Sequence, residues 1–252
     1  MKSFKIDYSK RMICLEDGSL VSLHSADGFE IIKKIWEYTN WANKYSYNFT
    51  WFGRPIIQLP DDLMRIQEII CNVKPTLIIE TGIAHGGSLI FYASLLKILG
   101  GGRVIGIDVE IRKHNRNAIE SHILSSMINL IEGDSTDVNI VDSVKKQINE
   151  NDVVLVILDS CHSKDHVLKE LMAYSAFVTQ NSYIIVADGI MQDVVGAPRT
   201  QDDWVYNNPQ QAIDEFIKIN KNFIKEDWLP VFKESEIYSI PSYYQNGFLK
   251  RV

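Results

Sequence analysis

The chain is poor in cysteine, which excludes several kinds of small scaffold and metal site. Cys14, Cys71 and Cys161 are its only cysteines in 252 residues, and their spacing shows no pairs. A disulfide framework requires paired cysteines in an oxidising compartment, and a structural zinc site requires closely spaced ones. We therefore expect neither feature, and a reducing cytoplasmic location fits this cysteine usage.

The chain also lacks an excess of positive charge and long apolar runs. Its 26 basic and 32 acidic residues give a formal net charge of -6, which argues against a nucleic-acid-binding protein. No apolar run is long enough to span a bilayer. The segment from Met1 to Asp7 leads into no apolar core, so we expect no signal peptide.

The composition indicates one globular α/β domain preceded by an N-terminal segment of different character. Apolar residues make up 46% of the chain and charged residues 23%, as in globular proteins. Residues 1–60 are rich in aromatic side chains, and we expect them to form an N-terminal cap or extension, with the α/β domain at 61–252. We interpret most of the aromatic rings as packing against this domain. The alternative is a cap over a substrate pocket, since aromatic rings stack well on sugars.

Apolar runs alternate with amphipathic segments from residue 61 onward. The pattern predicts strands at 76–80, 103–108, 127–132, 153–159 and 182–188, and helices at 61–72, 88–99, 115–124, 138–149, 164–178 and from 208 to about 223. In the N-terminal part, apolar residues at helical spacing predict a further helix at 28–43. Two further short strands are expected at 237–240 and 248–252. This alternation is typical of a doubly wound, mostly parallel sheet, whose ligands bind at the carboxyl ends of the strands.

A glycine-rich turn follows the first predicted strand of this domain. It contains Gly82 and the pair Gly86 and Gly87, and an acidic residue, Glu80, lies two positions before the first glycine. The spacing is not GxGxxG and no Walker lysine follows, so it argues against a P-loop and favours a nicotinamide site only weakly. An acid at this position is typical of turns that bind S-adenosylmethionine. Asp108 ends the next strand, where a carboxylate accepts the ribose hydroxyls.

Three carboxylates, those of Asp108, Asp159 and Asp188, fall at predicted strand ends. An aspartate at such a junction is often only a helix cap or turn residue. Asp159 and Asp188 follow the most apolar runs, so we expect both to face one crevice and to bind a hard divalent cation. His162 lies three residues after Asp159. It is either an ordinary loop histidine or a general base for an acceptor hydroxyl.

Two other segments have two interpretations each. The turn Gly133-Asp134-Ser135 follows the third strand, and it is either a plain turn or an adenine contact through Asp134. The basic cluster at 112–116 is either a solvated loop and helix start, which we favour, or a site for a phosphate or a nucleotide-sugar diphosphate.

Taken as a set, these motifs resemble those of the cephalosporin hydroxylase/rhamnosyl O-methyltransferase family. The resemblance covers roughly residues 51–193 and rests on Trp51-Phe52-Gly53-Arg54-Pro55, Gln67-Glu68, Lys74-Pro75, the turn from Glu80 to Ser88, Gly106 to Arg112, Glu132 to Ser135 and Leu158 to His162. It implies a class I, Rossmann-like S-adenosylmethionine methyltransferase fold. By this resemblance the cofactor is bound by Glu80, Gly82, Gly86, Gly87, Ser88, Asp108, Asp134 and Ser135.

The resemblance also implies the catalytic residues and the metal site. Asp159 and Asp188 match the metal-binding acids, and His162 matches the base in an Asp-x-x-His arrangement. Relatives often carry two adjacent acids at the end of the fifth strand, where this chain has Ala187 and then Asp188. The Mg²⁺ site is therefore weakened, completed by water or by Asp193, or absent.

The function expected from the sequence is transfer of a methyl group from S-adenosylmethionine to a hydroxyl. His162 and Asp159 would be catalytic, and Mg²⁺ would assist. The acceptor would be a sugar or nucleotide-linked sugar used for a surface polysaccharide or glycoside. Three alternatives stay open: O-methylation of an antibiotic or lipid intermediate, a non-catalytic subunit that binds the cofactor, and, disfavoured by the glycine spacing, a nicotinamide-dependent oxidoreductase. Homo-oligomerisation is a further open prediction.

Overall fold

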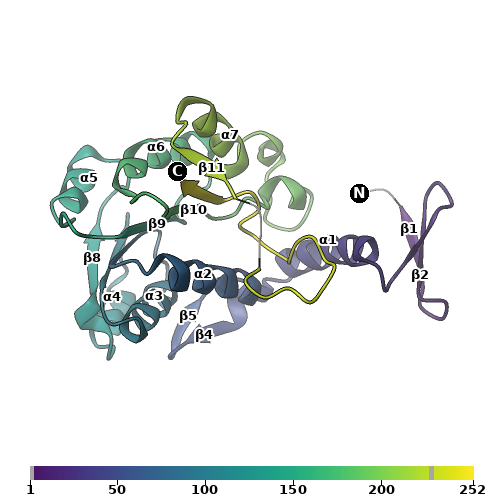
Figure 1. Cartoon of the computed structure of the whole chain (residues 1–252), viewed down its shortest axis with the longest axis horizontal. Coiled ribbons are helices and arrows are strands. Elements are labelled where there is room, and N and C mark those ends of the chain that lie inside the picture. Colours follow the sequence, from purple (N-terminus) through teal and green to yellow (C-terminus); the bar gives the residue numbers. More distant parts are fainter. Residues whose placement is uncertain (1–2, 227–229) are drawn as a thin grey trace.

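The computed structural model describes residues 3–226 and 230–252, and its centre is a mostly parallel sheet (Figure 1). Met1 and Lys2, part of the segment in which we expect no signal peptide, lie outside the described residues. Within these ranges the sheet has seven strands in the order β11-β12-β10-β9-β6-β7-β8. Strand β12 runs antiparallel to both of its neighbours, β10 and β11, and the other pairings in this sheet are parallel. The strands are β6 (Leu77–Thr81), β7 (Arg103–Asp108), β8 (Ile128–Glu132), β9 (Val154–Leu158), β10 (Tyr183–Val186), β11 (Phe223–Lys225) and β12 (Phe248–Arg251).

Helices cover both faces of the sheet, because the side chains of each central strand alternate between two cores. In β9, Leu155 and Ile157 pack into one core, while Val154 and Val156 pack into the other. The first core is closed by α2 (Pro60–Val73), α3 (Gly87–Ile98) and α4 (Lys113–Glu120), and the second by α5 (Val138–Lys145), α6 (Lys164–Tyr174) and α7 (Pro209–Ile219). This arrangement confirms the predicted doubly wound α/β fold.

The N-terminal residues divide into two parts (Figure 1). Strands β1 (Phe4–Asp7), β2 (Met12–Leu15) and β3 (Leu20–Ser22) form a small antiparallel sheet at the far end of α1 (Ala26–Ala42). The short helix η1 (Tyr45–Asn48) and the hairpin β4 (Phe49–Trp51) and β5 (Arg54–Ile56) then return to the main domain. There Trp51 donates a hydrogen bond to Ser94 of α3, 3.0 Å away. The division into a cap at 1–60 and a domain at 61–252 stays a prediction.

Most predicted elements are present with shifts at their ends, and one is wrong. Residues 237–240 form no strand, since their contacts are made by side chains, with Tyr238 bound to Asp27 and Ser239 bound to Glu30 of α1. The helix predicted for 164–178 ends at Tyr174 and continues as the short helix η3 (Ser175–Phe177). The remaining short helices are η2 (Ser125–Met127), η4 (Met191–Val194) and η5 (Asp202–Val205). None of the described helices has the length and apolar character needed to cross a membrane.

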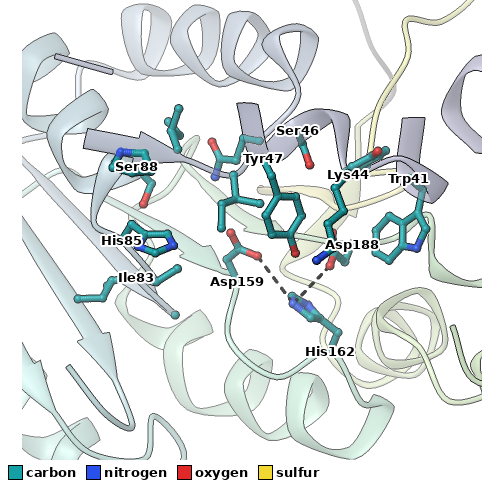
Figure 2. A pocket seen from close by; sticks show the side chains of 18 of the residues that line it. Trp41, Lys44, Ser46, Tyr47, Ile83, His85, Ser88, Asp159, His162 and Asp188 are labelled. Atoms are coloured by element: carbon teal, nitrogen blue, oxygen red, sulfur yellow. Dashed lines mark ion pairs between the residues drawn. The ribbon is translucent and has the colours of Figure 1, made fainter. Parts of the chain in front are cut away.

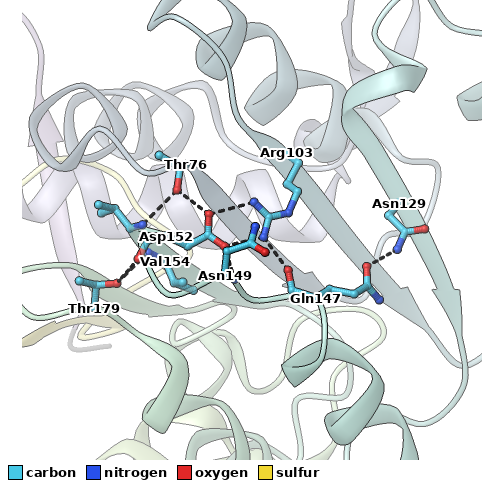
Figure 3. A network of polar contacts seen from close by, with 9 residues as sticks. Thr76, Arg103, Asn129, Gln147, Asn149, Asp152, Val154 and Thr179 are labelled. Carbon is cyan, nitrogen blue, oxygen red and sulfur yellow. Dashed lines mark hydrogen bonds and ion pairs between the residues drawn. The ribbon is translucent and has the colours of Figure 1, made fainter.

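Polar side chains tie three strands together at the amino edge of the sheet (Figure 3). Asp152, just before β9, accepts hydrogen bonds from Arg103 at the start of β7, with distances of 2.9 Å and 2.5 Å. It also accepts one from Thr76, just before β6, at 2.9 Å. The Arg103 guanidinium holds the pKa of Asp152 at about 2, which keeps the carboxylate charged. This network aligns the strands whose opposite ends carry the candidate site.

Candidate functional site

Two loops at the carboxyl edge of the sheet approach each other at Gly82 and Asp159. Gly82 follows β6 with a φ of +78°, and a Cβ at this position would lie 2.0 Å from the carbonyl oxygen of Asp159. Both the positive φ and the close approach require glycine. Because β6 and β9 are parallel neighbours, their loops leave the sheet side by side.

A cavity of about 220 Å³ opens beside this contact, and we call it the aromatic cavity (Figure 2). Asp159, His162 and Asp188 lie on one side of it. Its lining also includes residues from the N-terminal part and from the C-terminal half of the chain, namely Trp41, Lys44, Ser46, Tyr47, Gln58, Arg199 and Tyr243. A space lined by rings and polar groups suits a ring-shaped, hydroxylated molecule.

His162 lies close to both carboxylates, and its role as a general base stays a prediction (Figure 2). Its Nε2 atom is 3.4 Å from Oδ2 of Asp188 and 3.9 Å from Oδ1 of Asp159. Asp188 adopts a φ of +56°, a strained conformation for a residue other than glycine, and such strain is concentrated at functional sites. Burial and the negative charge of Asp188 raise the pKa of Asp159 well above its usual range. A cation in the cavity would relieve this repulsion.

The carboxylates of Asp159 and Asp188 fit a Mg²⁺ ion that keeps most of its water ligands. Their side chains stay 25% and 22% exposed, so both are accessible from the cavity. Ala187 is 1% exposed in the apolar core and supplies no ligand. Asp193, considered as a further ligand, instead lines a separate groove with Lys34 and Glu37. The described residues contain no cluster of three or more His, Cys, Asp or Glu side chains arranged to hold a metal, so the protein offers no complete cage.

A second cavity, of about 410 Å³, is also lined by Gly82 and Asp159. Both cavities share Gly82, Ala84 and Asp159, so they meet at the β6–β9 contact. The second cavity is also lined by Ile107, Asp108, Asp134, Ser135, Ser160, Cys161 and His166. The structure therefore brings four of the predicted cofactor residues, Gly82, Asp108, Asp134 and Ser135, to one space large enough for a nucleoside.

Asp108 has a structural role that the sequence did not reveal. Its Oδ2 atom accepts hydrogen bonds from the backbone N–H groups of Ile83 at 2.9 Å and Ala84 at 3.3 Å. Its Oδ1 atom accepts one from Glu110 at 3.2 Å. The carboxylate thus holds the glycine-rich turn in place from the neighbouring strand end.

The remaining predicted cofactor residues occupy different positions. The carboxylate of Glu80 is completely buried and accepts hydrogen bonds from Ser88 at 2.6 Å and Tyr92 at 2.9 Å, and burial raises its pKa to about 8. Ser88 and Gly87 line the aromatic cavity, whereas Glu80 and Gly86 line neither cavity. Gly86 is the N-cap of α3. Glu80 thus contacts the aromatic cavity only indirectly, through its hydrogen bond with Ser88.

Sequence reasoning missed several residues of the aromatic cavity. Lys44 and Arg199 carried no motif, although the aromatic content near Trp41 and Tyr47 had suggested a cap over a pocket. Arg199 donates to the backbone oxygen of Trp41 at 2.9 Å and so joins the end of α1 to the C-terminal half of the chain. By contrast, no member of the basic cluster at 112–116 lines either cavity, and Arg116 is paired with Glu120 and Glu132.

Two rhamnosyl O-methyltransferases are similar to this chain in sequence. Rhamnosyl O-methyltransferase of Mycobacterium leprae is 30% identical over 170 residues, which cover 65% of this chain and 71% of that protein. The Mycobacterium tuberculosis protein of the same name is 29% identical over 157 residues, covering 60% of this chain and 62% of that one. The chain thus spans less than two thirds of the second relative.

Solved structures share the fold. A structure of CmcI described as Mg-SAM has a TM-score of 0.54 and 20% identity, and the match covers 82% of this chain and 77% of that one. The methyltransferase MycE from the mycinamycin biosynthetic pathway, in complex with Mg and SAH, has a TM-score of 0.51 and 17% identity, and the match covers 75% of this chain and 48% of that one. The family model "Rhamnosyl O-methyltransferase/CmcI" matches residues 43–252. The chain therefore belongs to the rhamnosyl O-methyltransferase/CmcI family.

Proposed function

We propose that this protein transfers a methyl group from S-adenosylmethionine to a hydroxyl of a sugar or nucleotide-linked sugar. The observation that carries the proposal is the position of His162, which lies between Asp159 and Asp188 where a nucleoside-sized cavity meets an aromatic one. The names of the M. leprae and M. tuberculosis relatives support a rhamnosyl acceptor. A methyl donor in one cavity and a sugar in the other would meet beside Gly82.

The second cavity would hold the adenosine half of the cofactor. Asp108 would accept the ribose hydroxyls while it keeps the glycine-rich turn in place. The hydrogen bonds from Thr136 lower the pKa of Asp134, so this carboxylate is charged at neutral pH and can accept the adenine amino group. The methionine half would cross the Gly82–Asp159 contact toward the aromatic cavity, with Glu80 behind Ser88.

The aromatic cavity would hold the acceptor. The rings of Trp41 and Tyr47 would pack against the sugar, and Lys44 would donate hydrogen bonds to its oxygens. His162 would take the proton from the acceptor hydroxyl, whose oxygen would attack the sulfonium methyl as the carbon–sulfur bond breaks. The products would be the methyl ether, S-adenosylhomocysteine and a protonated His162. Asp159 and Asp188 would stabilise that imidazolium, and a positioned base typically contributes about 10²- to 10⁴-fold.

Mg²⁺ bound by Asp159 and Asp188 would lower the pKa of the acceptor hydroxyl.

The other parts of the proposal concern the cellular location and the partners of the reaction. We place it in the cytoplasm and without a nucleic-acid partner, because the chain is poor in cysteine and acidic. A small-molecule acceptor in glycoside or surface polysaccharide biosynthesis is the setting that fits the proposed sugar substrate. Homo-oligomerisation stays a prediction. The buried Ala187 favours one alternative, a non-catalytic subunit that binds the cofactor.

Calorimetry and a transfer assay test these ideas separately. S-adenosylhomocysteine should bind the protein and NAD should not. Labelled S-adenosylmethionine should then methylate a nucleotide-linked rhamnose or a simple rhamnoside, but not a catechol or a hydroxylated fatty acid. Binding of NAD without S-adenosylhomocysteine would refute the cofactor, and labelling only of the non-sugar acceptors would refute the sugar. Cofactor binding without transfer to any acceptor would support the accessory subunit.

A further inference from the structure

A buried carboxylate joins two loops behind the second cavity. Glu170 lies on α6 with no exposed surface, and its Oε1 atom accepts hydrogen bonds from the hydroxyls of Ser135 at 2.6 Å and Ser160 at 2.7 Å. Ser135 follows β8, and Ser160 follows β9. One oxygen atom therefore ties together loops from two strands that are not adjacent in the sheet.

His166 connects this carboxylate to the cavity itself. It lies one helical turn before Glu170, and its Nε2 atom is 3.5 Å from Oε1 of Glu170, 3.3 Å from the hydroxyl of Ser135 and 3.2 Å from that of Ser160. The ring lines the second cavity with Asp134 and Cys161, and its side chain is 22% exposed. The hydrogen bond to Glu170 raises the pKa of His166, against the opposite effect of burial.

This cluster is costly for a purely structural element. A buried carboxylate loses its hydration, and Oε2 of Glu170 has no hydrogen-bond partner among the residues that the structure describes. An apolar side chain would fill the same place beneath α6 without that cost. What the carboxylate and the imidazole add is a fixed position for the loops that carry Ser135 and Ser160, which form two walls of the cavity.

We propose that His166 and Glu170 are positioning residues for the adenosine half of the cofactor, which they serve by fixing the Ser135 and Ser160 loops around it. The proposal rests on the S-adenosylmethionine site proposed above. It predicts that the pair contributes to cofactor affinity through the nucleoside and not through the methionine.

Calorimetry with two ligands tests this assignment. S-adenosylhomocysteine contains the whole amino-acid part of the cofactor, whereas 5′-methylthioadenosine lacks it. His166→Ala should weaken the binding of both ligands about tenfold, since a hydrogen bond to a charged group is removed. Glu170→Gln should weaken both to a smaller extent because its amide oxygen can still accept from the serines, and His166→Gln should restore part of the loss.

The matched control is Asp165→Asn, an exposed change next to His166 that should leave both affinities unchanged. Circular dichroism on the free proteins shows whether each variant is folded. If His166→Ala does not fold, Glu170→Gln tests the proposal in its place. Affinities within twofold of wild type in the folded variants would overturn the positioning role, as would a loss confined to S-adenosylhomocysteine. If the wild type binds neither ligand, the proposed function itself fails, and this inference fails with it.

Discussion

The Nε2 atom of His162 lies 3.4 Å from Oδ2 of Asp188. The two residues come from different loops, one after β9 and one after β10, which are parallel neighbours in the sheet. Their contact orients the imidazole at the wall of the aromatic cavity. If His162 is the base, as proposed, it would take up a proton beside a carboxylate that stabilises the resulting charge.

His162→Ala should lower kcat about 10²- to 10⁴-fold, because the acceptor hydroxyl loses its proton acceptor. The affinity for S-adenosylhomocysteine should stay near the wild-type value, since His162 does not line the second cavity. Steady-state kinetics and calorimetry measure the two quantities. His114→Ala, an exposed histidine outside both cavities, is the control. Near-wild-type turnover at pH 7 in His162→Ala would remove this residue from the mechanism.

Metal removal should lower activity, and Mg²⁺ or Mn²⁺ should restore it. With two protein carboxylates and no ligand from Ala187, the affinity for metal should be modest. Asp188→Asn should therefore need more Mg²⁺ for half-maximal activity than the wild type. Activity assays after EDTA treatment, with elemental analysis of the same samples, measure both effects. Full activity in metal-free protein would leave Asp159 and Asp188 with the single task of stabilising His162.

Asp108→Ala should weaken cofactor binding and also destabilise the fold. The bonds from Ile83 and Ala84 show that the carboxylate supports the turn even without a ligand. Ile83 is buried, and leaving its N–H unpaired costs about 1–3 kcal/mol, whereas the N–H of the exposed Ala84 can bind water instead. Asp108→Asn keeps one acceptor oxygen and should recover most of the stability but less of the affinity. Urea unfolding and calorimetry separate the two effects, and an Asp108→Ala protein as stable as wild type would contradict the role in the turn.

The sequence was sufficient to predict the positions of those site residues that lie at the ends of sheet strands. Asp159 and Asp188 end parallel strands, so their meeting at one edge follows from topology once the strands are recognised. His162 is placed by its short distance in sequence from Asp159. Asp108 and Asp134, predicted separately as cofactor contacts, line the same cavity, and their contact with a cofactor stays a prediction.

The site residues that the sequence did not predict, or whose partners it did not predict, depend on contacts between residues distant in sequence or on side-chain hydrogen bonds that only the fold reveals. Trp41 and Arg199 meet across 158 positions, which no local pattern reveals. Glu80 carried the right motif, but its pairing with Ser88 and Tyr92 is visible only in three dimensions. His166 and Glu170 had a detectable signal, the four-residue spacing on a helix, which is also common on solvated helix faces.

Asp152 should stabilise the fold at neutral pH and lose that effect in acid. Its pKa is lowered from 3.8 to about 2, so its contribution is present above about pH 4 and disappears as the pH falls through 2. The shift corresponds to about 2 kcal/mol, and the side chain is only 7% exposed. Asp152→Asn should therefore be less stable than wild type at pH 7, and the difference should shrink below pH 4. Urea unfolding at several pH values measures it, and a pH-independent difference would contradict the ionic role.

Asp62 should have the opposite effect on the pH dependence of stability. It lies in the first turn of α2 with no exposed surface, and it accepts hydrogen bonds from the hydroxyl of Ser242 at 2.5 Å and the N–H of Tyr243 at 2.8 Å. Glu37 of α1 accepts from the N–H of Ser242 at 3.0 Å, so two acids hold the segment before β12. Burial outweighs these hydrogen bonds and raises the pKa of Asp62 to about 7 and that of Glu37 to about 7.

A carboxyl whose pKa is higher in the folded than in the unfolded state binds more protons when folded. Its stabilising effect is complete below about pH 4 and disappears as the pH rises toward 7. Between these limits each such group should lower the unfolding free energy by about 1.4 kcal/mol per pH unit. Asp62→Asn, which cannot ionise, should reduce the loss of stability between pH 5 and 7, whereas Asp61→Asn in the same helical turn should change it less. Urea unfolding at pH 5, 6 and 7 measures the slopes, and an unchanged slope in Asp62→Asn would show that Asp62 is ionised in the folded protein.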